Sequence, residues 1–221
     1  MVTMFFPHPN KKLHDHFSLK PYQGSNPSSS RFLFFGLDAN YDPEIEDKPY
    51  FSEIISYLED GVHYLKRRGV HHPFRLPHYR GDGALYHRRF AEIGFGPEHA
   101  EQVSFVELID VPTYGTSKLV LNDLKSTHID RLLDWVQNGS AEFIFIPIGV
   151  ARLLKRTSQF SWLPDRSMGH YKSLPILFRS DSKTVFSPYH FSCIGRGCLK
   201  KDRDLQVRDI GTLIRNSTRN L

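Results

Sequence analysis

The apolar run RFLFFGL at residues 31–37 is the feature that most constrains how this chain can fold. Its residues do not alternate between apolar and polar, and the run reaches a glycine near its end. That pattern is typical of a strand buried on both faces in the centre of a parallel sheet. Residues 104–112 and 142–149 have a similar character, so the sequence predicts three central strands.

Helical segments separate these strands. Residues 53–68 have apolar side chains at helical spacing, and a loop rich in His, Pro and Gly follows at 69–84. The alternation predicts an α/β fold, a three-layer sandwich with a mainly parallel central sheet. The remaining expected elements are helices at 84–95, 128–139 and 150–156, short strands at 174–178 and 183–188, and a last helix at 205–216.

The chain has 221 residues, enough for one well-buried domain. Pro and Gly punctuate residues 1–30, so we expect an irregular N-terminal arm with little local structure. No repeat or linker divides the rest, and residues 31–221 are expected to form a single α/β domain.

Several classes of protein can be excluded. Cys193 and Cys198 are the two cysteines, too few for a disulfide framework or a four-cysteine zinc site. No apolar run approaches the roughly 20 residues that a membrane-spanning helix needs. The N-terminus lacks the charge order of a signal peptide. We therefore expect a cytoplasmic protein, a monomer, that does not bind membranes.

The net charge of +5 is unevenly distributed. Residues 61–90 contain seven basic side chains and one acidic one, and residues 195–221 contain seven basic and three acidic ones. The rest of the chain is acidic. Two basic stretches indicate either a polyanionic partner or simply solvated surfaces, and the charge alone does not choose between them.

Polar residues follow the first and the last predicted strand. In α/β proteins ligands bind at the carboxyl ends of the strands. GLDANYDP follows the first strand, and its Asp38 is either a catalytic carboxylate or a turn cap. FSPYHFSCIGR at 186–196 follows the last strand, and it is either a packed cap or a binding loop.

Four segments together resemble the uracil-DNA glycosylase superfamily, most closely its bacterial mismatch-specific branch and the thymine-DNA glycosylase relatives. RFLFFGLDAN is similar to the motif after that family's first strand, of the form GINPG or GQDPYH. FVELIDVPT is similar to a KLVDRPT-like segment, and FSPYHFS to the closing loop NPSGLS or HPSPLS. The segments lie at 31–40, 86–95 (YHRRFAEIGF), 105–113 and 186–192.

The resemblance implies an enzyme that flips a base out of DNA and hydrolyses its N-glycosidic bond, with no metal and no cofactor. Asp38 matches the residue that positions water, and a carboxylate there would also stabilise an oxocarbenium-like sugar. Phe191 matches the intercalating leucine that acts as a wedge. Phe74 or Tyr79, in the loop before the second segment, would stack on the base.

Some positions depart from the family pattern. Ser187 stands where the closing loop usually has His or Asn to assist the leaving base, and His190 is a possible substitute. Asn40 replaces a tyrosine that blocks C5 substituents, so a bulky C5 group is not excluded. Glu107 stands where the family has a base-reading Asn or Lys. A carboxylate accepts hydrogen bonds, which favours the exocyclic amine of a modified cytosine over uracil.

The basic side chains expected to bind the DNA backbone are Arg75, Arg80, Arg88, Arg89, Arg196 and Lys200.

Three alternatives remain open at this point. One is a uracil or mismatch repair glycosylase, and another is a catalytically silent nucleic-acid-binding module on the same fold. The third is a metal-dependent phosphoesterase that uses Asp38, Asp42, Glu44 and Asp47, although these acids lie in one loop with no distant partner motif. His71, His72 and His78 lack regular zinc-ligand spacing, and we expect no metal site there.

Overall fold

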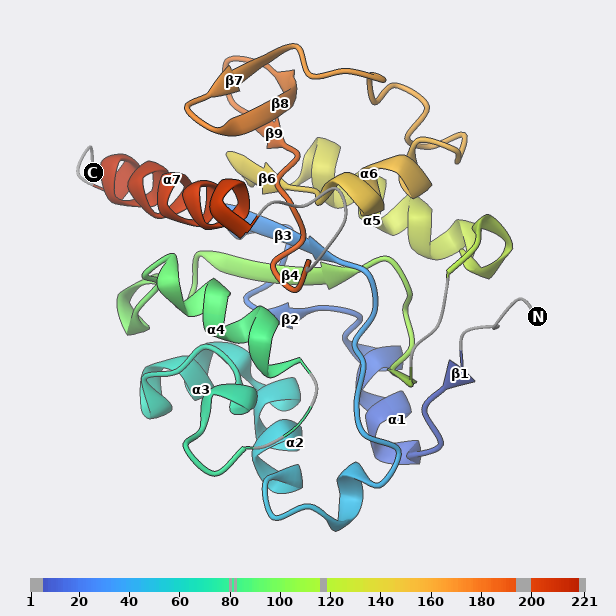
Figure 1. Cartoon of the computed structure of the whole chain (residues 1–221). Coiled ribbons are helices and arrows are strands. Elements are labelled where there is room, and N and C mark those ends of the chain that lie inside the picture. The colour runs from blue at the N-terminus through green and yellow to red at the C-terminus, as the bar shows by residue number, and fades with distance from the viewer. Residues whose placement is uncertain (1–5, 80, 82, 116–118, 194–199, 219–221) are drawn as a thin grey trace.

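The computed structural model describes residues 6–79, 81, 83–115, 119–193 and 200–218 (Figure 1). Its centre is a seven-stranded mixed sheet in which the four middle strands, β4, β3, β6 and β9, run parallel and the outer ones antiparallel. The expectation of an α/β fold with a mostly parallel central sheet is confirmed. In sheet order the strands are β2 (Gln23–Gly24), β4 (Val103–Glu107), β3 (Phe32–Gly36), β6 (Phe143–Phe145), β9 (Thr184–Phe186), β8 (Leu174–Arg179) and β7 (Gly169–Tyr171).

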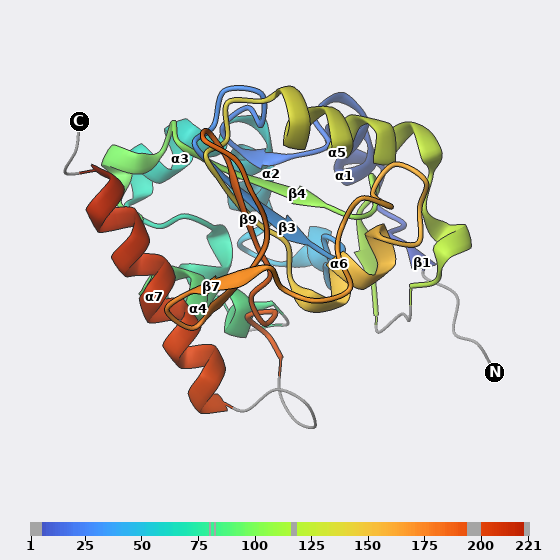
Figure 2. The ribbon, with the colours of Figure 1, turned by 90° about the horizontal axis from the view of Figure 1, so that it is seen from above.

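Helices cover both faces of this sheet (Figure 2). Leu33 and Phe35 of β3 pack with apolar residues of α5 (Ser126–Asn138) and α6 (Ile148–Leu154). Phe32 and Phe34 belong to the core under α4 (Ala84–Glu92) and α7 (Lys200–Thr218). Alternate side chains of a strand point to opposite faces, so a continuous apolar run is what a strand between two helical layers requires.

The order of the parallel strands creates a natural binding position. β3 comes first along the chain, yet it lies between β4 and β6. The chain therefore leaves β3 toward one side of the sheet and later returns on its other side. Such a switch point opens a crevice at the carboxyl ends of the two adjacent strands, here β3 and β6.

The N-terminal segment has more structure than we expected. Helix α1 (Lys11–Leu19) begins at Asn10, whose side chain accepts a hydrogen bond from the backbone N–H of Leu13. β2 extends the main sheet by pairing with β4, and β1 (Phe6–Pro7) pairs with β5 (Thr113–Tyr114). The prediction of little local structure in residues 1–30 is therefore wrong for their described part.

The helix expected at 53–68 is two helices, α2 (Phe51–Glu59) and α3 (Gly61–Arg68). Asp60 separates them and caps α3 by accepting from the N–H of His63. Gly61 approaches β2 so closely that a Cβ there would lie 2.8 Å from the backbone nitrogen of Gly24. Four 3₁₀ turns complete the described elements: η1 (Ile45–Asp47), η2 (Pro73–Arg75), η3 (Pro97–His99) and η4 (Leu121–Asp123).

Within the described part of the chain, every helix is too short or too polar to span a lipid bilayer.

The close approach of Gly61 to β2 predicts a stability change. Gly61→Ala should lower the free energy of unfolding by about 1–3 kcal/mol, because the added methyl group must displace backbone. Gly169→Ala is the matched control, since nothing lies within 4 Å of a Cβ at that position. Urea unfolding of both variants measures the difference, and equal stabilities would show that α3 does not need this contact.

Candidate functional site

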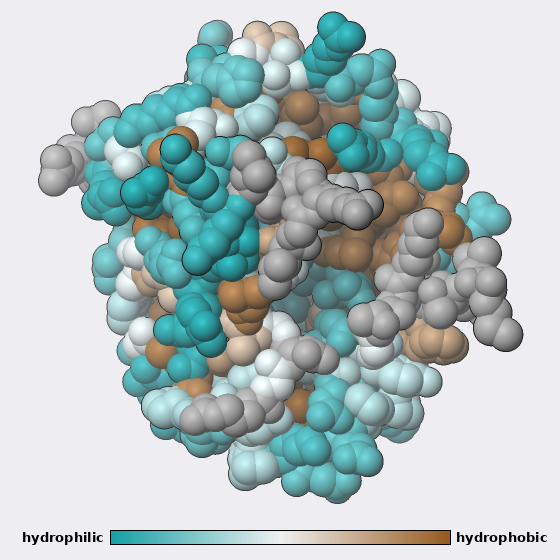
Figure 3. Space-filling model, in the orientation of Figure 1, coloured by the Kyte–Doolittle hydropathy of each residue, from teal (hydrophilic) through white to brown (hydrophobic). Residues whose placement is uncertain are grey.

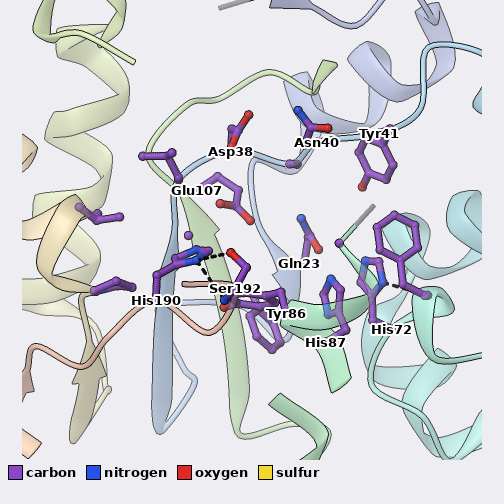
Figure 4. A pocket seen from close by; sticks show the side chains of 18 of the residues that line it. Gln23, Asp38, Asn40, Tyr41, His72, Tyr86, His87, Glu107, His190 and Ser192 are labelled. Atoms are coloured by element: carbon purple, nitrogen blue, oxygen red, sulfur yellow. Dashed lines mark hydrogen bonds between the residues drawn. The ribbon is translucent and has the colours of Figure 1, made fainter. Parts of the chain in front are cut away.

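A cavity of about 560 Å³ lies at the carboxyl ends of the central strands, next to the switch point. Its size is within the range of small-molecule sites. Residues of β2, β4, α4 and η2 line it. The segments that follow β3 and β6 and the loop that follows β9 complete the lining. The close-up in Figure 4 looks into this cavity.

The cavity exists because β3 and β4 have no large apolar side chain at their carboxyl ends on this face of the sheet. On the face beneath α4, β3 presents Phe32 and Phe34 and then Gly36, while β4 presents Phe105 and then Glu107. Gly36 and Glu107 are paired in register. A Cβ at Gly36 would lie 2.6 Å from the carboxyl carbon of Glu107, so glycine is what leaves room for this carboxyl group.

Glu107 is held in a largely neutral state. Its Oε2 atom is buried and has no hydrogen-bond partner among the described residues. Burial, reinforced by the nearby charge of Asp38, raises the pKa of Glu107 to about 8. At neutral pH the carboxyl group therefore both donates and accepts a hydrogen bond. Glu107 is therefore also a hydrogen-bond donor, whereas the sequence predicted an acceptor only.

Asp38 lines the cavity and is fixed in position by its neighbours. The hydroxyl group of buried Thr113 donates to Asp38 Oδ2 over 2.5 Å. Asn40 Nδ2 donates to Thr113 Oγ1 (3.3 Å) and to the carbonyl oxygen of Gly115 (2.7 Å). Asn40 also lines the cavity, but its amide hydrogens are thus occupied, and only its oxygen is left for a ligand.

Aromatic rings form the opposite side of the cavity. In Figure 4, His190, Tyr86, His87 and His72 lie in a row that faces Asp38, Glu107 and Gln23. The rings of His72 and His87 stack 3.7 Å apart, with an interplanar angle of 10°. Burial lowers the pKa of His87 to about 3, so this wall is uncharged at neutral pH. A flat, neutral, aromatic wall suits a planar ligand.

Of the two stacking candidates, the structure brings only Phe74 to the cavity. Tyr79 is buried and stacks against Phe74, with ring centroids 4.2 Å apart, but it is not among the described residues that line the cavity.

His190 lies at the other end of the row of rings. Its Nδ1 atom is 2.7 Å from the Ser192 hydroxyl oxygen and accepts from the Ser192 backbone N–H over 3.4 Å. With Nδ1 as the acceptor, the neutral ring carries its proton on Nε2. Burial lowers the pKa of His190 to about 4, so at neutral pH it is an uncharged hydrogen-bond donor.

Two residues of the closing loop do not take their predicted positions. Ser187 is buried outside the cavity, and its backbone N–H donates to the carbonyl oxygen of Pro175. Phe191 is 4% exposed and contacts the rings of Tyr86 and Phe90, which does not fit a projecting wedge.

Side chains from two helices hold this loop in place. Arg89 of α4 donates to the carbonyl oxygen of Phe191, and buried Arg203 of α7 donates to that of Cys193. Gln206 accepts from the backbone N–H of Tyr189. The loop is thus fixed by contacts to its main chain, which keeps Phe191 in the core.

The predicted DNA-backbone residues have different environments. Arg88 on α4 and Lys200 on α7 are exposed, and these helices pack against each other. Arg75 is half-buried, and Arg89 is turned toward Phe191. In Figure 3, hydrophilic surface covers the region of α4 and the start of α7, and apolar surface gathers across the cavity, near α6. Arg80 and Arg196 lie outside the described residues.

The acidic loop does not form a metal-ligand set. Asp42 and Glu44 both form ion pairs with Lys48. In the described part of the chain, no three His, Cys, Asp or Glu side chains are close enough together to hold a metal ion. These residues therefore do not form the metal-binding cluster that the phosphoesterase alternative requires.

Tyr86, His87 and Gln23 are among the lining residues that sequence reasoning missed. Tyr86 and His87 belong to the second motif segment and directly precede Arg88 and Arg89, which were predicted to bind DNA. Gln23 stands in a segment without a periodic pattern, and only its pairing with β4 brings it to the cavity.

Neither a scan against protein-family models nor a search of curated proteins found a match to this chain.

The buried carboxyl group of Glu107 predicts how stability depends on pH. Its pKa is about 8 in the folded chain against an ordinary value of 4.5, so the folded state binds more protons between these two values. Stability should therefore fall as the pH rises through that window, by up to about 1.4 kcal/mol per pH unit from this group.

Glu107→Gln removes the titrating group and keeps the shape. The free energy of unfolding of the variant minus that of the wild type should increase from about pH 5 to about pH 8, as measured by urea unfolding. Parallel curves for the two proteins would contradict a buried, neutral Glu107.

Proposed function

We propose that this protein is a DNA glycosylase with the uracil-DNA glycosylase fold, which hydrolyses the N-glycosidic bond of a flipped base. The observation that carries the proposal is the convergence of all four motif segments on one cavity. The first contributes Asp38, the second Tyr86 and His87, the third Glu107 and the fourth His190. Parallel strands of an α/β sheet end at one edge in any case, so the support comes from the side chains found there, which include Asp38, Glu107 and His190, the residues that the resemblance assigns to the site.

The chemistry assigned to the cavity needs only groups of this chain. The flipped base lies along the aromatic wall with its polar edge toward Glu107. Asp38, held by Thr113, orients a water molecule toward C1′ and accepts its proton as the water oxygen bonds to carbon. The electrons of the C1′–N bond pass to the base, and the Asp38 carboxylate stabilises the positive charge on the sugar.

His190 is the group proposed to assist the leaving base. Its Nε2 proton is available for a hydrogen bond to the negative charge that develops there, because Nδ1 is occupied by Ser192. Ser187, the other candidate, does not reach the cavity. In this proposal His190 takes the role that a His or Asn has in the family at the position of Ser187, three residues earlier in the same loop.

A modified cytosine is the proposed base, in foreign or damaged DNA. Glu107 accepts from an exocyclic amine in either protonation state, and this contact does not need its proton. Arg88 and Lys200 are the exposed cations proposed to contact phosphates. Uracil or mismatch repair by the same site is the alternative that an excision panel would distinguish.

A catalytically silent nucleic-acid-binding module is the second candidate. The buried position of Phe191 favours it, because base flipping usually needs a side chain that fills the vacated stack. The glycosylase proposal requires another group to act as wedge, or the closing loop to move when DNA binds.

Asp38→Ala tests the enzymatic proposal. Duplexes carrying uracil, a thymine mismatch or C5-modified cytosines are incubated with protein, and abasic sites are revealed by alkaline cleavage. The wild type should release the modified cytosine, and the variant should be slower by about 10²- to 10⁴-fold while binding DNA equally well. Asp165→Ala, an exposed acid paired with Lys155, is the control. A wild type that binds these duplexes but releases no base would favour the silent module.

Base preference should change with pH because Glu107 titrates. As the pH rises from about 6 to about 9, Glu107 loses its proton and can no longer donate to O4 of uracil, while it still accepts from the amine of cytosine. The ratio of modified-cytosine to uracil excision should therefore increase by about tenfold, the usual worth of one hydrogen bond. In Glu107→Gln this ratio should stay constant, and the same pH dependence in that variant would rule out Glu107 as its source.

A further inference from the structure

Gln23 lies in the wall of the cavity, although it comes from the N-terminal segment. It is 5% exposed, and its backbone pairs in register with Phe105 of β4. Directly paired residues point to the same face of a sheet, and so does the residue two positions further along a strand. Gln23 and Glu107 therefore project from neighbouring strands on the same face, and Figure 4 shows both directed into the cavity.

The Gln23 side chain lines the cavity, and no hydrogen bond of its amide to a described residue is found. Glu107 Oε2 is fully buried and also has no partner among the described residues. Buried polar groups normally have partners, since removing them from water is unfavourable. Two such groups next to each other, facing a wall of rings, are matched by a flat ligand with donors and acceptors along its edge.

We propose that Gln23 is a specificity-determining residue, which together with Glu107 contacts the polar edge of the bound base. This inference rests on the proposed function, because it takes the ligand of the cavity to be a nucleobase. The amide offers one acceptor and two donor hydrogens, and it does not titrate. Gln23 thus supplies the part of base recognition that stays constant while Glu107 gains or loses its proton.

The position of Gln23 also gives the N-terminal segment a role. β2 is two residues long, and it is held between β4 and the close approach of Gly61. The amide is therefore presented by backbone that is anchored on both sides. A residue held in this way can discriminate between ligands, because it cannot move aside for a base whose donors and acceptors do not match its own.

Binding of free bases to the full ¹⁵N-labelled protein tests this inference without requiring catalysis. The side-chain amide signals of Gln23 are assigned by their loss in Gln23→Leu. Free cytosine, 5-hydroxymethylcytosine and uracil are then titrated into the wild type, Gln23→Leu and the control Gln159→Leu. Gln159 binds Ser126 and Asp130 and does not line the cavity.

Cytosine or 5-hydroxymethylcytosine should shift the Gln23 amide signals, and Gln23→Leu should bind these bases at least about tenfold more weakly. The control should bind like the wild type. Unmoved Gln23 signals, with shifts elsewhere in the cavity, would overturn the inference, as would unchanged affinity in Gln23→Leu. If a base shifts Gln23 but no oligonucleotide is cleaved, the glycosylase proposal fails and the recognition role stands.

Discussion

The site depends on one pairing, that of Gly36 with Glu107 at the ends of two adjacent parallel strands. Glycine at the end of β3 leaves the space that the Glu107 carboxyl group fills, and the apolar core below it, including Phe34 and Phe105, gives that group no partner. A side chain at position 36 would close the cavity or expel the carboxyl group. The same constraint explains why Glu107 stays largely protonated at neutral pH.

Burial gives the rest of the cavity a low charge. His87 and His190 are neutral at physiological pH, and the network from Asn40 through Thr113 fixes Asp38 at the mouth. Electrostatic interactions are strong in such surroundings, and a single oriented carboxylate can then stabilise a developing positive charge. The neutral groups inside the cavity thus recognise the base, and the charged Asp38 carboxylate acts on the sugar.

The sequence predicted much of this fold because its central strands are buried on both faces. Continuous apolar runs such as residues 31–37 cannot belong to an exposed edge, and their order along the chain located Asp38 at the carboxyl end of a central strand. Glu107 was expected inside the strand at 104–112, and only the resemblance assigned it to the site. The failures concern contacts between distant segments. Gln23 lies in a two-residue strand that has no pattern of its own, and Phe191 is buried because Arg89 and Arg203 hold its loop. The protonation of Glu107 likewise depends on its tertiary neighbours.

The most direct test of the account is a crystal structure of Asp38→Ala bound to a duplex that carries a C5-modified cytosine. The variant should trap the uncleaved substrate with its base turned out of the helix. The account predicts that this base lies along Tyr86 and His87, with its polar edge toward Glu107 and Gln23. A base that stays stacked in the duplex, or a duplex bound away from the cavity, would contradict it.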